Sequence, residues 1–183
     1  MVGLAAALVV CLVAEPATAT IKAGRLGIGD SVMLGAKDEL HAHGFGIVDA
    51  VKSRQFYAAP SRVRYWRKAG KLPRNVVLHL GNNGIVLLST CYHAVQAAPY
   101  RNVFLVNLKV PRDWRVVDNR RLRRCAKHFK RAYLIDWYGH SHDHSGWFAR
   151  DGYHLTGTGA SAYASFVAHR IASVSRRAPG APR

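Results

Sequence analysis

The sequence predicts a single α/β domain, a three-layer α/β/α sandwich with a central parallel sheet of about five strands. Three observations predict this fold. Short and nearly continuous apolar runs recur along the 183 residues, segments with helical periodicity separate them, and neither an internal repeat nor a second domain is visible. Strands that are apolar on both faces are typical of parallel sheets covered by helices on both sides.

The amino-terminal half of the chain alternates strands and helices. Residues 25–28 form the first predicted strand, residues 31–43 a helix, and residues 46–49 the second strand. A helix is predicted over residues 60–70, where Pro60 occupies the first turn. Proline is tolerated there because its missing N–H has no partner within the helix.

The carboxyl-terminal half continues the same alternation. The apolar run 76–80, which stops at Gly81, predicts a third strand, and two further strands and three helices follow. The two strands are expected at 103–106 and 132–135, and the helices at 85–97, 118–130 and 158–174. Residues 137–150 are polar and rich in histidine, which predicts a loop.

Composition limits the class of protein. Apolar residues make up 49% of the chain, which is too many for a disordered protein. The longest apolar run, residues 4–14, is shorter than the roughly 20 residues of a membrane-spanning helix, which excludes a polytopic membrane protein. The net charge of +17 indicates an anionic partner such as nucleic acid, anionic lipid or a wall polymer.

The amino terminus has the pattern of an export signal. Residues 1–19 are predicted to be a signal peptide, with the apolar core 4–14 followed by Ala17-Thr18-Ala19, which fits a cleavage site. No basic residue precedes the core, so a buried helix is the alternative. The folded domain is then expected over residues 20–175 and a disordered basic tail over residues 176–183.

Two cysteines, Cys91 and Cys125, remain after such a cleavage. An even pair in an exported chain is compatible with a disulfide. Two buried free thiols are the alternative, and the sequence leaves both open.

Polar groups follow the strands at the edge where ligands bind in parallel sheets. Ser31 comes after the first strand at a helix amino terminus, whose N–H groups can stabilise an oxyanion. The side-chain amide of Asn83, within Gly81-Asn82-Asn83-Gly84, is a second candidate donor. The alternatives are a simple helix cap at Ser31 and a simple turn at Asn83.

Asp151 and His154 complete a set of catalytic residue types. Ser, Asp and His in this order suit a hydrolase triad on an α/β sheet. The spacing of three residues lets Asp151 hold one imidazole nitrogen of His154, while the other nitrogen takes a serine proton. The alternative is a surface helix start capped by Asp151.

The ordered set GDS (29–31), GNNG (81–84) and DGYH (151–154) resembles the sequence blocks of the SGNH (GDSL-like) hydrolase superfamily. Longer stretches resemble the SGNH domains attached to membrane acyltransferases, including peptidoglycan O-acetyltransferases. The resemblance covers about residues 25–171. These stretches are GDSVMLGA (29–36), VDAVKSRQ (48–55), VPRDW (110–114), LIDW (134–137) and DGYHLTGTGASAYA (151–164).

The resemblance implies a flavodoxin-like SGNH hydrolase fold and a role for each matching residue. Ser31 would be the nucleophile, His154 the general base and then acid, and Asp151 the residue that orients His154. The oxyanion donors would be the Ser31 N–H, the Asn83 side chain and the N–H of Ser53, which stands where the family has glycine. Neither a metal nor another cofactor is implied.

The expected function is serine-dependent ester hydrolysis or O-acetyl transfer on an acylated, extracytoplasmic glycan, with hydrolysis favoured over transfer. Transfer would need a separate membrane protein as acyl donor. The expected location is extracytoplasmic, either secreted or attached to the cell envelope. The alternative function is a non-catalytic binding module for an anionic cell-wall polymer, and no nucleic-acid partner is expected, because basic runs such as residues 120–124 usually form a solvated helix face.

Two further features are assigned less directly. Trp114 and Trp147 are candidates for substrate binding, with core packing as the alternative. Histidines 140, 142 and 144 could bind zinc, but a polar loop beside the active site is the favoured interpretation.

Overall fold

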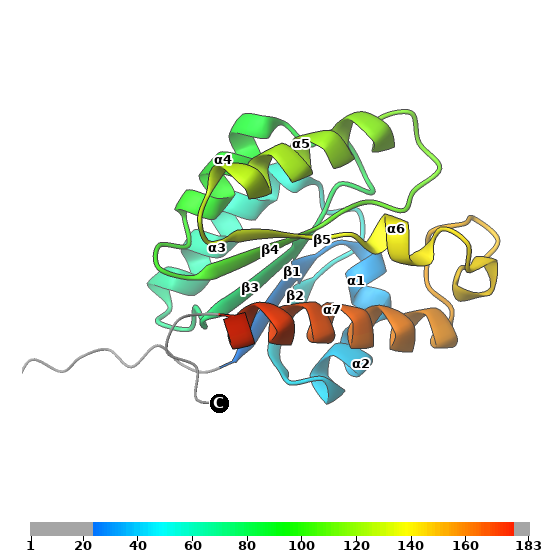
Figure 1. Ribbon diagram of the computed structural model, residues 1–183, viewed down its shortest axis with the longest axis horizontal. Helices are drawn as coiled ribbons and strands as arrows, with labels where there is room; N and C mark the ends of the chain where they lie inside the picture. The colour runs from blue at the N-terminus through cyan, green and yellow to red at the C-terminus, as the bar shows by residue number, and fades with distance from the viewer. Residues whose placement is uncertain (1–23, 178–183) are drawn as a thin grey trace, which may run out of the picture.

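The computed structural model describes residues 24–177, and these fold around a five-stranded sheet in which every neighbouring pair is parallel. The strand order is β2-β1-β3-β4-β5 (Figure 1). The strands are β1 (Arg25–Gly29), β2 (Phe45–Ala50), β3 (Asn75–His79), β4 (Asn102–Val106) and β5 (Ala132–Ile135). The predicted fold class is therefore confirmed.

Helices cover both faces of the sheet, as Figure 1 shows. One layer consists of α3 (Ala59–Lys68), α4 (Leu88–Gln96) and α5 (Arg115–His128), and the other of α1 (Ser31–Gly35), α2 (Lys37–Ala42) and α7 (Gly157–Arg177). A short helix, α6 (Trp137–Ser141), follows β5 at the carboxyl edge, and single 3₁₀ turns lie at Phe56–Ala58 and Ser145–Trp147.

The central strand explains why the apolar runs are continuous. In β3, Val76 and Leu78 belong to the core under α3, α4 and α5, whereas Val77 belongs to the core under α1, α2 and α7. Successive side chains of a strand point to opposite faces. Both faces are buried here, so every position of the strand is apolar or hydrogen-bonded.

Two predicted elements differ from the structure. The helix expected over 31–43 is two helices, because the chain leaves helical geometry at Ala36, where α1 ends and α2 begins. The loop expected over 137–150 contains α6, whose first turn forms because the Asp136 carboxylate accepts the Gly139 N–H at 3.0 Å. The favourable N-cap residue outweighs the polar composition of this segment.

The chain ends differ partly from the predicted domain limits. Helix α7 continues through Arg177, so Arg176 and Arg177 belong to the folded domain rather than to the tail. The predicted signal peptide, residues 1–19, lies outside the described residues. Among residues 24–177, no helix combines the length and apolarity that crossing a membrane requires.

A disulfide joins Cys91 of α4 to Cys125 of α5, with a Cα–Cα distance of 6.3 Å. Of the two alternatives that the sequence leaves open, the structure has the bonded one. Both cysteines are fully buried in the core between these helices. Disulfides persist mainly in oxidising compartments.

Removing this bond is expected to destabilise the domain. The bond closes a loop with a sequence separation of 34 residues, and such cross-links raise the free energy of unfolding by about 2–4 kcal/mol. We expect the free energy of unfolding of Cys91→Ala/Cys125→Ala, measured with urea, to be lower than that of wild type by about this amount. Wild-type protein unfolded in the presence of a reductant should have the same free energy of unfolding as the variant. A wild-type free energy of unfolding that does not change with reductant would contradict the expectation.

Candidate active site

Ser31 stands at the first position of α1, directly after β1 and one buried residue, Asp30. Asp30 is the N-cap of α1 and accepts the Val32 N–H at 3.0 Å. A Cβ at Gly29 would overlap the Met33 side chain, so the tight passage from strand to helix requires glycine. This local geometry leaves Ser31 half-buried at the carboxyl edge of the sheet.

The side chains of Ser31, His154 and Asp151 form a continuous chain of hydrogen bonds. His154 Nε2 lies 2.9 Å from Ser31 Oγ, and His154 Nδ1 lies 2.7 Å from Asp151 Oδ2. An ionised Asp151 can only accept, so Nδ1 carries the proton and Nε2 is free to accept from the Ser31 hydroxyl. The structure thus brings together all three residues that the sequence analysis singled out for a triad.

Asp151 is fixed and kept ionised by its own turn. Its other carboxylate oxygen accepts the backbone N–H groups of Tyr153 and His154 at 3.1 and 3.0 Å. Burial alone would raise the pKa of Asp151. The hydrogen bonds from the His154 ring and from the two backbone N–H groups outweigh burial, and the pKa of Asp151 is lowered.

The other two predicted oxyanion residues lie in neighbouring loops. Ser53 follows β2 and has a positive φ of 59°. The Asn83 side chain, in the loop after β3, has its Nδ2 3.5 Å from the carbonyl oxygen of Arg54. The loop that carries Ser53 and the loop that carries Asn83 are therefore in contact.

Both loops are anchored to the residues that precede Ser31. From the first loop, Arg54 Nη1 donates to the Gly29 carbonyl at 3.4 Å. From the second, Asn82 donates its side-chain and backbone N–H groups to Asp30 Oδ2 at 2.9 and 3.3 Å. The candidate nucleophile and the candidate oxyanion donors are thus held by one connected network.

A carboxylate in β2 holds Arg54 in place. Asp49 accepts hydrogen bonds from Arg54, Arg62 and Trp66 at 2.8–2.9 Å. Burial would raise the pKa of Asp49, but hydrogen bonds from these three side chains lower it below its ordinary value. Asp49 and Arg54 are not among the residues predicted for the site, and their place within the VDAVKSRQ stretch is the signal in the sequence that points to them.

The chain is similar in sequence and in structure to known proteins. No protein-family profile matches the chain. The chain is 32% identical over 149 residues to the peptidoglycan O-acetyltransferase OatA of Listeria monocytogenes, and this match covers 81% of the chain and 24% of that protein. The chain therefore spans about a quarter of the length of the curated relatives it matches.

Among solved structures, the C-terminal catalytic domain of Streptococcus pneumoniae peptidoglycan O-acetyltransferase A superposes with a TM-score of 0.75 at 22% identity. That match covers 85% of this chain and 96% of the other. The chain is thus similar in sequence to part of the Listeria O-acetyltransferase and shares the fold of the pneumococcal catalytic domain. A Clostridium thermocellum family 3 carbohydrate esterase shares the fold, with a TM-score of 0.65 at 16% identity over 85% of this chain and 98% of that one.

A lysine side chain makes a further contact that supports the Asp151–His154 turn. Lys109, in the segment after β4, donates from Nζ to the Gly152 carbonyl at 3.1 Å and lies 4.6 Å from the centre of the Phe148 ring. Burial, and then the charge of Arg115, lower the pKa of Lys109. The sequence offered no signal for this contact, because it joins two segments that are 43 residues apart.

The two tryptophans predicted to bind substrate also take part in packing. Trp114 Nε1 donates to the Gly81 carbonyl at 3.0 Å, and the ring packs against the core. Trp147 stacks on His144 with ring centres 3.9 Å apart and lies beside the buried Trp137. Both indoles remain half-buried, and their contact with substrate stays a prediction.

The histidine-rich segment packs in the same way. His140 stacks on Phe166 with ring centres 3.9 Å apart, and His142 Nδ1 lies 3.0 Å from the Gly139 carbonyl oxygen. Within residues 24–177, no group of three or more His, Cys, Asp and Glu side chains is arranged to hold a metal ion. The three histidines remain exposed, so the segment presents a polar surface in which His140 also packs on Phe166.

The positive φ of Ser53 allows an experimental test of strain in the backbone. A residue with a β-carbon at this φ costs about 1–2 kcal/mol relative to right-handed geometry, and glycine does not incur that cost. We expect Ser53→Gly to raise the free energy of unfolding by about 0.5–1 kcal/mol, measured by urea unfolding, because part of the gain is lost to chain entropy. Tyr100→Gly, at a φ of 61° and away from the site, is the matched control. A destabilised Ser53→Gly would contradict the strain argument.

Proposed function

We propose that this SGNH domain transfers an acyl group from an O-acetylated glycan through an acyl-Ser31 intermediate, and that water is its usual acceptor. The observation that carries the proposal is the hydrogen-bonded series from Ser31 Oγ through His154 to Asp151. A serine hydroxyl is a weak nucleophile until a base removes its proton during attack. The names of the relatives, peptidoglycan O-acetyltransferases, support a glycan ester as the substrate.

The first half of the reaction forms the acyl-enzyme. Ser31 Oγ attacks the ester carbonyl carbon while His154 Nε2 takes its proton, and the carbonyl oxygen becomes negatively charged. The N–H groups of Ser31 and Ser53 and the side-chain amide of Asn83 would stabilise this oxyanion. His154 then gives the proton to the departing sugar oxygen, and the acyl group stays on Ser31.

The second half returns the enzyme to its starting state. His154 takes a proton from the acceptor hydroxyl, the acceptor oxygen attacks the acyl carbon, and the proton passes back to Ser31 Oγ. Water as acceptor releases a carboxylic acid, whereas a sugar hydroxyl gives a new ester. The half-exposed position of His154 and Asp151, whose side chains are 38% and 43% exposed, favours access of water.

The disulfide and the names of the relatives support an extracytoplasmic location, where peptidoglycan lies. If the chain transfers rather than hydrolyses, the acyl group would come from a separate membrane protein that serves as donor. The domain's own residues then need only receive and pass on the acyl group.

One assay tests the proposal. Purified protein is incubated with an acetylated glycan, with and without an acceptor oligosaccharide, and free acetate is measured beside acetate attached to the acceptor. We expect free acetate to dominate, and Ser31→Ala to yield neither product. Acetate found mainly on the acceptor oligosaccharide would contradict water as the usual acceptor. Wild-type protein that yields neither product would overturn the proposal as a whole.

Asn83 provides a test of the oxyanion donors. Loss of one such donor lowers turnover by about 10²–10³-fold, because the negative oxygen then lacks a hydrogen bond that forms fully only in the transition state. We expect this loss in kcat for Asn83→Ala with 4-nitrophenyl acetate, with KM nearly unchanged. Asn119→Ala, which alters an asparagine bonded to the Leu108 backbone, serves as the comparison. An Asn83→Ala variant within threefold of wild type would remove Asn83 from the mechanism.

A further inference from the structure

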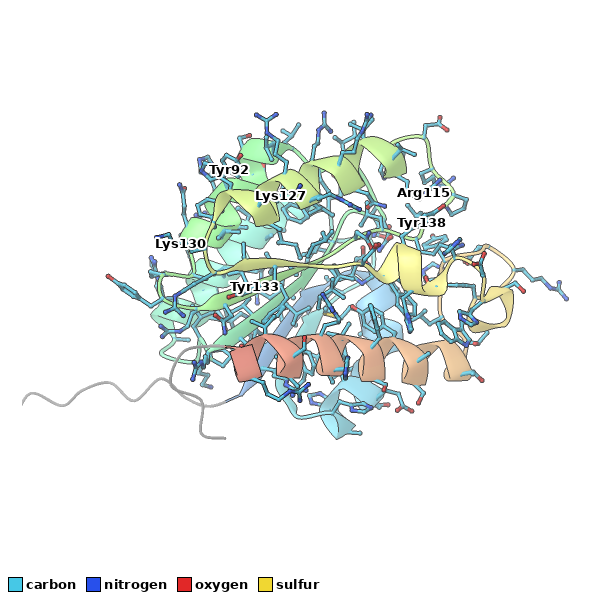
Figure 2. All side chains as sticks on the ribbon, viewed as in Figure 1. Tyr92, Arg115, Lys127, Lys130, Tyr133 and Tyr138 are labelled. Atoms are coloured by element: carbon cyan, nitrogen blue, oxygen red, sulfur yellow. A yellow bond between two sulfur atoms is a disulfide. The ribbon has the colours of Figure 1, made fainter. Side chains whose placement is uncertain are left out.

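A basic groove runs along the free edge of β5, between α5 and α7, and has a volume of about 750 Å³. Figure 2 shows Lys127 in the last turn of α5, Lys130 in the turn that follows this helix, and Tyr133 on β5. Six cationic side chains line this groove, and they come from α5, α7 and the turns before β3 and β5. They are Arg74, Arg123, Lys127, Lys130, Arg131 and Arg170.

The charge of the basic groove is not neutralised by the folded domain. The residues that line it include neither aspartate nor glutamate. All six cations are exposed, and in the described part of the chain none of them lies within salt-bridge distance of a carboxylate. Like charges gathered in one concave strip repel each other and attract a multivalent anion.

The floor of the basic groove narrows the choice of anion. Tyr133 is half-buried and stacks on the fully buried Phe104, with ring centres 5.3 Å apart. Single-stranded nucleic acids are bound by cations together with aromatic rings on which bases stack. The rings here are already stacked on each other, which favours a polyanion without bases.

Four of the six cations are arginines, whose planar guanidinium groups form paired hydrogen bonds with phosphate oxygens. We infer that the basic groove binds a linear polymer of polyol or sugar units joined by phosphodiesters. The polymer would lie along β5, and successive phosphates would contact the arginines and lysines on both walls. This surface would account for part of the high net charge of the chain.

The basic groove is separate from the candidate active site. None of the residues that line it belongs to the Ser31–His154–Asp151 series or to the loops of Ser53 and Asn83. The inference does not depend on the ester chemistry, because binding is measured without turnover. Ser31→Ala protein should therefore bind the polymer as wild type does.

The test compares two triple variants with the same change in charge. One removes groove cations, Arg123→Gln/Lys127→Gln/Lys130→Gln. The other removes three exposed cations of α3 on a different face, Arg64→Gln/Arg67→Gln/Lys68→Gln. Binding to immobilised poly(glycerol phosphate) is measured over a series of salt concentrations, and thermal unfolding verifies that each variant is folded.

We expect the groove triple variant to bind at least about tenfold more weakly and with a shallower dependence on salt, because fewer counterions are released. The α3 triple variant should stay within about threefold of wild type. If polymer binding weakens equally in both variants, the assignment of the basic groove as the binding site is overturned, because the effect would then follow net charge alone. Wild-type binding that is absent or independent of salt would overturn the inference as well.

Competing polymers test the choice of occupant. Single-stranded DNA, polygalacturonate and poly-glutamate are added as competitors to the same immobilised polymer. Weaker competition by all three than by free poly(glycerol phosphate) supports the inference. If DNA, the carboxylate glycan or the acidic peptide competes more strongly than free poly(glycerol phosphate), the inference of a phosphodiester polymer is overturned and that competitor is the preferred occupant.

Discussion

Ser31→Ala is expected to lower the hydrolysis of 4-nitrophenyl acetate by about 10⁴–10⁶-fold, the largest effect among the variants considered. The reason is that, in the proposed mechanism, Ser31 Oγ forms the covalent bond to the acyl carbon. His154 Nε2 lies 2.9 Å from Ser31 Oγ, so the two side chains act as one unit. We therefore expect His154→Ala to lower the rate of hydrolysis nearly as much as Ser31→Ala does, and the double variant to lower it only a little further.

The non-additivity separates a catalytic pair from two independent contacts. Rates are measured for wild type, both single variants and the double variant, and circular dichroism compares their folded state. Ser161→Ala, an exposed serine of α7, is the control and should keep full activity. A Ser31→Ala variant that retains more than about a tenth of wild-type activity would exclude an acyl-Ser31 intermediate.

The second large effect concerns pH and the buried His79 at the end of β3. Burial lowers the pKa of His79 to about 3. Its Nδ1 lies 2.9 Å from the Tyr163 hydroxyl, and within residues 24–177 its Nε2 has no hydrogen-bond partner. The folded state thus holds the neutral ring, whereas the unfolded chain protonates it near its ordinary pKa of about 6.5.

The direction of the effect follows from the number of bound protons. Between pH 6.5 and 3 the unfolded state binds more protons at His79 than the folded state, so stability falls as the pH falls. Each pKa unit corresponds to about 1.4 kcal/mol, and the whole window to about 5 kcal/mol. The stabilising contribution is complete above pH 6.5 and lost progressively towards pH 3.

Urea unfolding between pH 4 and 8 measures this contribution. His79→Gln should be less stable than wild type at pH 7 but lose less stability on acidification. His93→Gln, at an exposed position of α4, should keep the wild-type slope. Parallel pH profiles for wild type and His79→Gln would show that His79 is not the group responsible.

The fold and the grouping of Ser31, Asp151 and His154 could be predicted from the sequence for a common physical reason. A strand buried on both faces must be apolar throughout, as in residues 76–78, so its position is visible in the composition. Chemistry in a parallel sheet gathers where strands end, so Ser31 and Asn83 were found by inspecting the residues that follow apolar runs. The spacing of Asp151 and His154 fits a single turn, so the contact between these two side chains can be predicted without knowing how the rest of the chain folds.

The supporting contacts could not be predicted because they join segments that only folding brings together. Asp30 and Asn82 are 52 residues apart, and Arg54 and Gly29 are 25 residues apart. No local pattern specifies such partners. The same holds for Trp114, whose indole N–H donates to a backbone carbonyl 33 residues away.

The position of the disulfide along the chain has a consequence for damage to the backbone. Ser31, Ser53 and Asn83 precede Cys91, whereas Asp151 and His154 follow Cys125. The bond therefore connects the part of the chain that carries the proposed nucleophile with the part that carries the proposed base. A protease that cuts once between these cysteines leaves two fragments that remain covalently attached, with every proposed catalytic group still on one molecule.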